Sequence, residues 1–239
     1  MIPQLEGFLR QGPLAVAFAL TCVFFAFIYF GFAGAAFWLS GRLLPAWHIG
    51  QIVDERPLRD GQIAREIRRS LGSIAVFGLL TVLQVLAYRA GWVRLDWEAS
   101  SAGIAAQAVI LFAWNELHFY GCHALLHRRW LYRHVHRVHH ESLVPTPFAT
   151  YSFHWVEAAM LGSVMLLATL VYPFHPVALG TLPLVSLLLN TIGHWNYDLF
   201  AGRARSACRE HSRHHRLVQG NYGFYLPWLD RWFGTALKR

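Results

Sequence analysis

Histidines are concentrated in one stretch of this chain and recur in a shorter stretch near its C-terminal end. HALLH is followed by HRVHH, and the H-x-x-H-H spacing of the second cluster returns in HSRHH. The three clusters comprise His123, His127, His136, His139, His140, His211, His214 and His215. Residues three and four apart lie on one face of an α-helix. Because neutral imidazole binds iron, copper, nickel and zinc, the clusters predict a cage for metal.

The number of histidines indicates two metals. A tetrahedral zinc site needs four ligands, whereas eight nitrogens fit two ions with positions left for water or dioxygen. Iron has the redox chemistry that would use such positions. A zinc protease would require glutamate where Ala124 stands, and a haem protein would need single axial histidines. A non-catalytic metal-handling membrane protein stays open as an alternative, although transporters place ligands at mid-membrane.

Two further histidines lie at the edges of apolar runs and are candidate ligands. They are His154 in SFHWVE and His194 in GHWN. Glu157 and Asn196 follow them closely and are candidates for orienting imidazoles through hydrogen bonds. Glu157 has an alternative interpretation, as a residue that caps the start of a helix.

Composition predicts an all-α integral membrane protein. Of 239 residues, 55% are hydrophobic and 14% are charged, whereas soluble domains have about 25% charged residues. The expected spans are residues 14–39, 71–88, 104–120, 155–172 and 177–192. The first run is too long for the apolar core of a signal peptide and is expected to be a retained transmembrane helix. A short amphipathic helix over residues 62–70 is expected at the membrane surface.

Basic residues predict the orientation. Segments 42–69, 123–153 and 195–239 hold 18 of the 21 Lys and Arg residues. The positive-inside rule makes that side cytoplasmic, with the N-terminus outside, and places the histidine clusters in the cytosol. The net charge of +8 is explained by arginines that flank apolar segments, so nucleic-acid binding is not expected. The last two apolar runs have a re-entrant hairpin as an alternative.

The chain is expected to be a single membrane domain, residues 1–239, with four or five transmembrane helices. Its successive parts are N-terminal helices with a basic loop (1–121), the first two histidine clusters (122–154), a transmembrane hairpin (155–194) and a cytosolic cap with the third cluster (195–239).

The motifs resemble a known family. HALLH, HRVHH and HSRHH, with PTPFATYSFHWVEA and the tail NYGFYLPWLDRWFGT, are similar to the fatty acid hydroxylase/sterol desaturase superfamily of membrane di-iron enzymes. The resemblance covers roughly residues 115 to 235. It implies a bundle of transmembrane helices under a cytosolic cap that holds two iron ions. It also implies that the eight clustered histidines are ligands and that His154 and His194 fall where members have further histidines.

The implied activity is dioxygen-dependent oxidation of a lipid C–H bond. Hydroxylation of a fatty acyl or sterol-like lipid is the first expectation, and a desaturase or a sterol methyl oxidase with the same site is the alternative. The electrons are expected from a separate ferredoxin, cytochrome or reductase, which would dock on the basic face. That face would also attract anionic membrane lipids. Aromatic residues expected to line a substrate groove are Trp114, Phe119, Tyr120, Phe148, Tyr151 and Phe153. An aromatic belt at the membrane interface is the alternative explanation of these residues.

Overall fold

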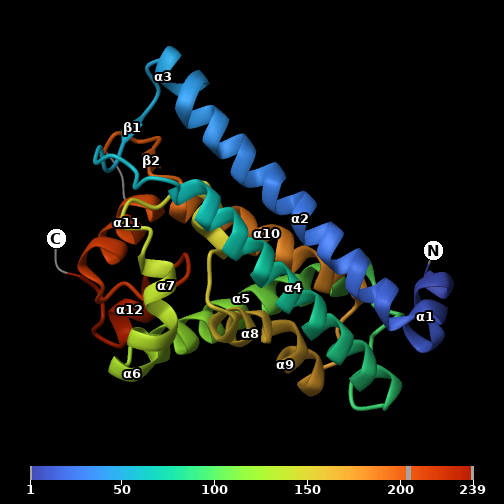
Figure 1. The fold of residues 1–239 in the computed structure, drawn as a ribbon. Helices are drawn as coiled ribbons and strands as arrows, with labels where there is room; N and C mark the ends of the chain where they lie inside the picture. Colours follow the sequence, from blue (N-terminus) through green and yellow to red (C-terminus); the bar gives the residue numbers. More distant parts are fainter. Residues whose placement is uncertain (1, 203–205, 238–239) are drawn as a thin grey trace.

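The computed structural model describes residues 2–202 and 206–237. Apart from two short strands, β1 (Gln51–Ile52) and β2 (Tyr197–Asp198), which pair antiparallel, the regular elements in these ranges are helical (Figure 1). The α-helices are α1 (Ile2–Gln11), α2 (Leu14–Trp38), α3 (Leu44–Ala46), α4 (Gln62–Arg89), α5 (Ser101–Leu126), α6 (Arg129–Leu131), α7 (Arg137–His140), α8 (Trp155–Gly162), α9 (Val164–Val171), α10 (Pro176–His194), α11 (Ala207–Leu217) and α12 (Trp228–Trp232). Two π-helical segments, η1 (Leu39–Leu43) and η2 (Tyr132–His136), and one 3₁₀ segment, η3 (Pro147–Tyr151), complete the set.

Three helices in the described ranges are long and apolar enough to cross a membrane. They are α2 with its continuation through Ala46, then α4 and α10. The predictions for residues 14–39, 71–88 and 177–192 are confirmed to this extent. The shortest, α10, has 19 residues and is therefore about 28 Å long, close to the thickness of the hydrocarbon core at about 30 Å.

The prediction of a separate surface helix before the second span is wrong. Helix α4 begins at Gln62 and runs without a break to Arg89. Its first turns carry Gln62, Glu66 and Ser70 on one face, and these polar residues are buried against the protein, at 5%, 1% and 0% exposure. The polar face of this segment therefore packs inside the molecule.

The count of five spans is not confirmed. Helix α5 is long, but it contains the buried polar residues Gln107, Asn115 and Glu116 and is not among the three helices that are apolar enough. The segment predicted as a span at residues 155–172 consists of two eight-residue helices, α8 and α9, which meet at Ser163. Each is about 12 Å long, so neither crosses the hydrocarbon core alone.

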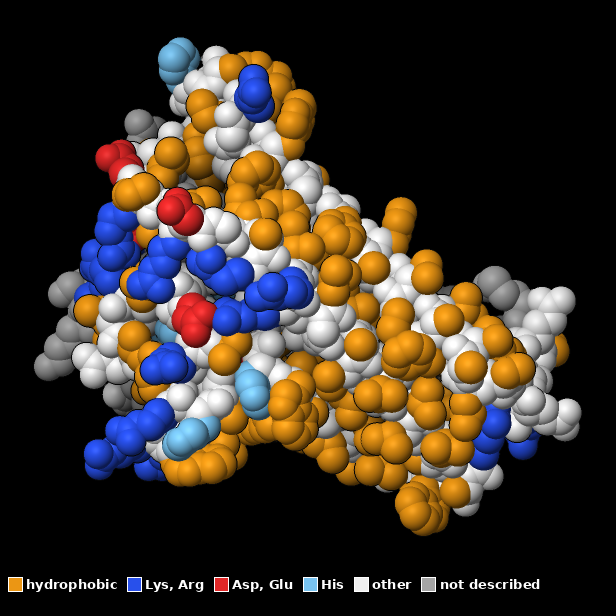
Figure 2. All heavy atoms as spheres, in the orientation of Figure 1, with side chains coloured by type: hydrophobic (Ala, Val, Ile, Leu, Met, Phe, Trp, Pro, Cys, Tyr) orange, Lys and Arg blue, Asp and Glu red, His pale blue; other side chains and the backbone are white. Residues whose placement is uncertain are grey.

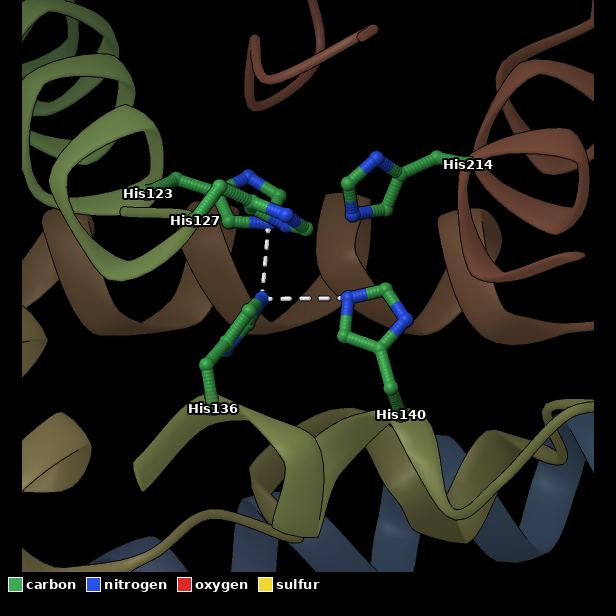
Figure 3. A group of neighbouring side chains, drawn as sticks. All are labelled: His123, His127, His136, His140 and His214. Carbon is green, nitrogen blue, oxygen red and sulfur yellow. Dashed lines mark hydrogen bonds between the residues drawn. The ribbon is translucent and has the colours of Figure 1, made fainter. Parts of the chain in front are cut away.

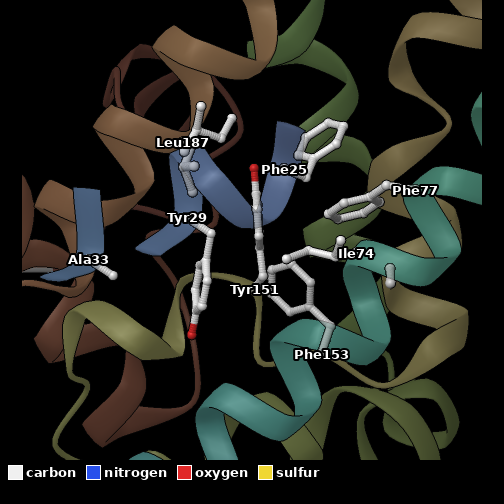
Figure 4. Close-up of a cluster of buried hydrophobic side chains, with 10 residues drawn as sticks. Phe25, Tyr29, Ala33, Ile74, Phe77, Tyr151, Phe153 and Leu187 are labelled. Carbon is white, nitrogen blue, oxygen red and sulfur yellow. The ribbon is translucent and has the colours of Figure 1, made fainter. Parts of the chain in front are cut away.

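An aromatic core joins these helices (Figure 4). The Tyr151 ring lies between Tyr29 of α2, on which it stacks at 6.0 Å, and Phe77 of α4, which it meets edge-on at 5.1 Å. Tyr29 donates a hydrogen bond of 2.9 Å to the carbonyl of Phe148. These contacts fix η3, directly downstream of the second histidine cluster, against the bundle.

The cap lies at one end of the bundle. Helices α6, α7, α11 and α12 gather where α5 and α10 end and where α4 begins, while the N-terminus and the turn between α4 and α5 lie at the opposite end (Figure 1). Arg side chains cluster over the cap, and hydrophobic side chains cover the helices (Figure 2). Four residues of the basic count, Arg203, Arg205, Lys238 and Arg239, lie outside the described residues. The cytoplasmic location of the cap stays a prediction.

Candidate metal centre

Nine histidines meet inside the cap in two groups. In each group the candidate ligand atoms lie within 4.8 Å of one another. The first group comprises His123, His127, His136, His140 and His214 (Figure 3). The second comprises His139, His194, His211 and His215. The groups adjoin, because the rings of His140 and His215 are 4.7 Å apart between centroids.

Helical spacing explains how the clusters divide. The pair four residues apart in each H-x-x-H-H cluster stays in one group, and the histidine between them joins the other. His139 thus leaves the first group, and His214 leaves the second. Positions i and i+4 are separated by about 40° around a helix, whereas i+3 lies on the other side of i. Two facing helices can therefore exchange one ligand each.

Hydrogen bonds fix the tautomers of three rings in the first group. The Nδ1 of His123 is 2.9 Å from the Tyr222 carbonyl, that of His214 is 2.7 Å from the Gly220 carbonyl, and that of His136 is 2.8 Å from a carboxylate oxygen of Glu157. Carbonyl and carboxylate oxygens accept, so each Nδ1 donates its proton and each Nε2 keeps a lone pair. The Nε2 atoms of His123 and His136 nevertheless face each other at 3.2 Å.

In the second group the tautomer of one ring, His194, is fixed in the same way. The Nδ1 of His194 donates to the carbonyl of Asn190 at 2.9 Å, one helical turn earlier in α10. Its Nε2 lone pair then faces the Nε2 of His139 at 3.2 Å and that of His211 at 2.9 Å. His211 in turn lies 3.0 Å from the Nε2 of His215. One lone pair pointing at two ring nitrogens is an arrangement that a cation stabilises.

The distances suit metal coordination. The Nε2–Nε2 distances within the two groups, including that of His140 to His136, lie between 2.9 and 3.2 Å. Two imidazole ligands at right angles on one ion, with bonds of about 2.1 Å, are about 3.0 Å apart, and at the tetrahedral angle about 3.4 Å apart. A first group of five nitrogens also exceeds the four ligands of a tetrahedral zinc site. The donor set therefore fits two ions, one with five nitrogen ligands and the other with four.

Burial keeps these imidazoles neutral. Loss of solvent lowers the pKa of His127 to about 3 and that of His214 to about 4. Burial, followed by neighbouring imidazoles, lowers the pKa of His136 and His139 well below the ordinary value. Neutral imidazole is the form that binds metal, so the rings hold their lone pairs ready at neutral pH.

Among the described residues, Glu157 is the only carboxylate that forms a hydrogen bond with a ring of the first group. It lies in α8, 1% exposed, and accepts from the equally buried His136. Its second oxygen has no partner among the described residues. The predicted role of Glu157 in orienting an imidazole agrees with this contact, and Glu157 also lies in the first turn of its helix.

A tight loop supplies the carbonyls behind His214 and His123. After α11 the chain passes through Val218 in a left-handed conformation (φ 58°), which is uncommon for a β-branched residue. Gly220 follows with φ 64°, and a Cβ there would lie 2.7 Å from a backbone oxygen. Asp230 then accepts from the Tyr222 backbone N–H at 2.7 Å. Glycine at 220 lets the loop fold back onto the histidines.

Two of the predicted site residues lie elsewhere. His154 is outside both groups and precedes α8, where its Nδ1 accepts from the backbone N–H of Val156. Among the described residues Asn196 has no hydrogen bond to a histidine ring; its amide forms two 2.9 Å hydrogen bonds with the backbone of Asp54. The expectation that His194 is near the centre agrees with its place in the second group.

Sequence reasoning missed the buried carboxylate of Glu66. This residue of α4 accepts from Gln62, Ser142 and Thr146. Ser142 and Thr146 follow the second histidine cluster directly, so Glu66 ties that cluster to α4. The available signal was a single glutamate among the arginines of residues 65–69.

An apolar cavity of about 90 Å³ lies on the bundle side of the histidines. Phe119 and Phe153 line it, and their rings lie 5.1 Å from those of His123 and His139. Tyr151 also lines it, so three of the aromatic residues predicted for a groove are found there. A separate, more polar cavity of about 220 Å³ on the cap side is lined in part by His211.

A family model for fatty acid hydroxylase matches residues 108–235, which is more than half of the chain and includes all nine histidines. The chain belongs to this family. The resemblance to the fatty acid hydroxylase/sterol desaturase superfamily is thereby confirmed.

Curated relatives of the chain are named as sterol-oxidising enzymes. Delta(7)-sterol 5(6)-desaturase erg3C of Aspergillus fumigatus is 26% identical over 73% of this chain and 62% of that protein. Lathosterol oxidase of Rattus norvegicus is 28% identical over 73% and 61%, and methylsterol monooxygenase 1 of Gallus gallus is 32% identical over 54% and 44%. The chain spans about three fifths of the length of the first two relatives. No solved structure matches the chain.

Proposed function

We propose that this protein is a membrane-bound non-haem di-iron oxygenase that uses dioxygen to hydroxylate a lipid. The observation that carries the proposal is the pair of adjoining buried histidine groups, in the first of which the Nε2 lone pairs of His123 and His136 face one another without a proton to share. Family membership and the names of the relatives support lipid oxidation.

Two iron ions would be held by the five nitrogens of the first group and the four of the second. When bound, they would supply the redox chemistry needed for an unactivated C–H bond, which acid–base side chains cannot attack. The chain's own atoms hold the ligands. The carbonyls of Tyr222, Gly220 and Asn190 and the carboxylate of Glu157 keep the proton on each Nδ1 and direct each Nε2 inward.

The apolar cavity beside the histidines would bind the substrate. Phe119, Tyr151 and Phe153 line its wall and exclude water from the reacting C–H bond. We place the electron donor, a separate ferredoxin, cytochrome or reductase, on the arginine-rich surface of the cap, which we assign to the cytoplasmic side (Figure 2). Anionic membrane lipids would be attracted to the same surface.

Desaturation is the second candidate, because two of the named relatives are a sterol desaturase and a lathosterol oxidase. A sterol methyl oxidase has similar support from methylsterol monooxygenase 1. Product analysis under ¹⁸O₂ separates these reactions: hydroxylation adds labelled oxygen to the lipid, whereas desaturation removes two hydrogens and adds none.

Metal content tests the centre itself. We expect about two iron ions per chain in the detergent-purified protein by elemental mass spectrometry, and loss of at least one in His214→Ala. His154→Ala is the matched control, because that ring lies outside both groups, and it should keep both metals. One metal or none in the unmodified protein would refute the di-iron proposal and favour a metal-handling protein without catalysis.

A further inference from the structure

The apolar cavity beside the histidines adjoins a second apolar cavity. The second has a volume of about 360 Å³ and extends toward α1, where Leu5 and Leu9 line it. Five residues line both: Phe25, Thr81, Gln84, Met165 and Pro183. The two cavities therefore adjoin along these five side chains, and together we call them the passage, with Phe119 and Phe153 at its histidine end.

Helix α10 gives the length of the passage. Pro176 lines the second cavity, Pro183 lines both, and Asn190 lines the first. These residues are seven apart and so share one face of the helix. Pro176 and Asn190 are about 21 Å apart along the helix axis, and His194 lies one turn beyond Asn190. The passage thus follows most of the membrane thickness from the end opposite the cap.

One polar group in this passage lacks a partner. Asn115 of α5 lines the first cavity and is 6% exposed, and its amide nitrogen has no hydrogen-bond partner among the described residues. An unpaired buried donor is costly and uncommon in folded proteins. By contrast, the amide of Gln84 at the junction lies 3.4 Å from the Thr169 hydroxyl, and that of Asn190 donates to the Thr150 carbonyl.

Asn115 lies in line with the metal centre. Asn115, Phe119 and His123 are spaced by four residues and share one face of α5. Phe119 meets the His123 ring edge-on at 5.1 Å. Asn115 and His123 are about 12 Å apart along the helix axis. A ligand atom held by the Asn115 amide would therefore sit inside the passage at a fixed depth from the histidines.

We propose that the passage binds a sterol-like lipid with one hydroxyl or oxo group, and that the Asn115 amide donates a hydrogen bond to that oxygen. The proposal rests on the proposed lipid oxidation. The apolar body of the ligand extends past Gln84 into the second cavity, and the part between Asn115 and the histidines carries the oxidised C–H bond. Asn115 is thus a positioning residue, which sets how far from the substrate oxygen oxidation occurs.

Binding of two matched probes tests the anchor without turnover. The probes are tritiated cholesterol and cholest-5-ene, which has the same skeleton without the hydroxyl, and both are titrated onto the full chain in detergent. We expect the wild-type protein to bind cholesterol about tenfold more tightly, the contribution of one hydrogen bond. In Asn115→Leu the ratio should fall to about one while the affinity for cholest-5-ene is kept.

The second cavity has its own variant. Gly180 lines it, and a Cβ there would meet nothing within 4 Å. Gly180→Leu should therefore fold normally, narrow the cavity and weaken binding of both probes by tenfold or more. Gly31→Leu is the control, because Gly31 is exposed on α2, has equally open surroundings and lines neither cavity; it should change neither affinity.

Three results would overturn the proposal: no binding of either probe by wild-type protein, a tenfold preference retained in Asn115→Leu, or unchanged binding in Gly180→Leu. Iron content is measured on the same preparations. Protein that lacks iron but shows the Asn115-dependent preference would refute the di-iron function and leave the binding site standing. Protein that holds two irons but lacks the preference for cholesterol would refute the binding site and leave the di-iron function standing.

Discussion

The contact between Glu157 and His136 provides a quantitative test of how the chain holds its metal. The carboxylate oxygen and the ring Nδ1 are 2.8 Å apart, and both side chains are 1% exposed. Glu157→Gln keeps the shape and an oxygen that accepts from Nδ1, but it cannot ionise. Burial raises the pKa of Glu157 well above its ordinary value, so the negative charge that the variant removes is the one that a cation bound to His136 would stabilise. Hydrogen bonds to charged groups contribute about 1.5–3 kcal/mol and neutral ones about 0.5–1.5 kcal/mol. The loss is about 1–1.5 kcal/mol, which weakens metal binding about 5- to 12-fold.

Removing the acceptor altogether should cost more. Glu157→Ala leaves the Nδ1 of His136 buried without a partner and the ring free to turn, and loss of such a supporting contact lowers metal affinity about 10- to 100-fold. Affinity is measured by competition with a chelator on detergent-purified protein, with metal counted per chain. The matched control is Glu141→Gln, because Glu141 is 39% exposed in a salt bridge with Arg69, and it should bind metal as wild type does.

The order of the three proteins decides the matter. We expect wild type to bind most tightly, Glu157→Gln next and Glu157→Ala least. If Glu157→Ala retains wild-type affinity, the carboxylate serves only the start of α8, and the account of how His136 is oriented is wrong. Thermal unfolding of the metal-free variants separates a folding defect, which lowers their melting temperature, from a defect confined to metal binding.

Two further predictions concern stability. Glu66→Ala leaves three buried side-chain donors without their acceptor. It should therefore lower the free energy of unfolding by at least about 3 kcal/mol and the melting temperature by about 6–12 °C. Glu55→Ala, at an exposed site, should change neither quantity, and equal melting temperatures of the two variants would contradict this role of Glu66. The second concerns pH: burial holds the pKa of His127 at about 3 and that of His214 at about 4, below the ordinary 6.5, so below pH 6.5 the unfolded chain takes up protons that the folded chain does not. The melting temperature of chelator-treated protein should thus be level above pH 6.5 and fall from there toward pH 4, and a level or rising profile on acidification would contradict the burial of neutral imidazoles.

The ligand types could be predicted because helical spacing is local. Histidines three and four apart must share a helix face, whatever the rest of the fold does. Which group each ring joins could not be predicted, because it depends on how α7 and α11 are rotated toward each other. His139 and His214 exchange groups for that reason.

The limits of the predicted spans have a similar cause. Residues 62–70 have a polar face that suits a membrane surface and a buried network equally well. The polar face of α4 packs inside the protein because Glu66 accepts hydrogen bonds from three donors, two of them 76 and 80 residues away in the sequence. Helix α5 is a case of the same kind, since Asn115 and Glu116 are buried in a helix whose length alone would suit a span.

His154 and His194 show why neighbouring sequence could not separate a ligand from a cap. Both stand beside a tryptophan at the edge of an apolar run. His194 is the last residue of α10, so its backbone N–H is satisfied within the helix and its Nδ1 reaches the carbonyl of Asn190, four residues earlier. His154 immediately precedes α8, where free backbone N–H groups take the ring nitrogen as their acceptor. The Nε2 of His194 is directed toward the metal site because its Nδ1 donates to the Asn190 carbonyl. The Nδ1 of His154 instead accepts from the backbone N–H of Val156. The carbonyls of Tyr222, Gly220 and Asn190 belong to the backbone, which every residue type has, so the support of this centre becomes visible only when the chain is folded.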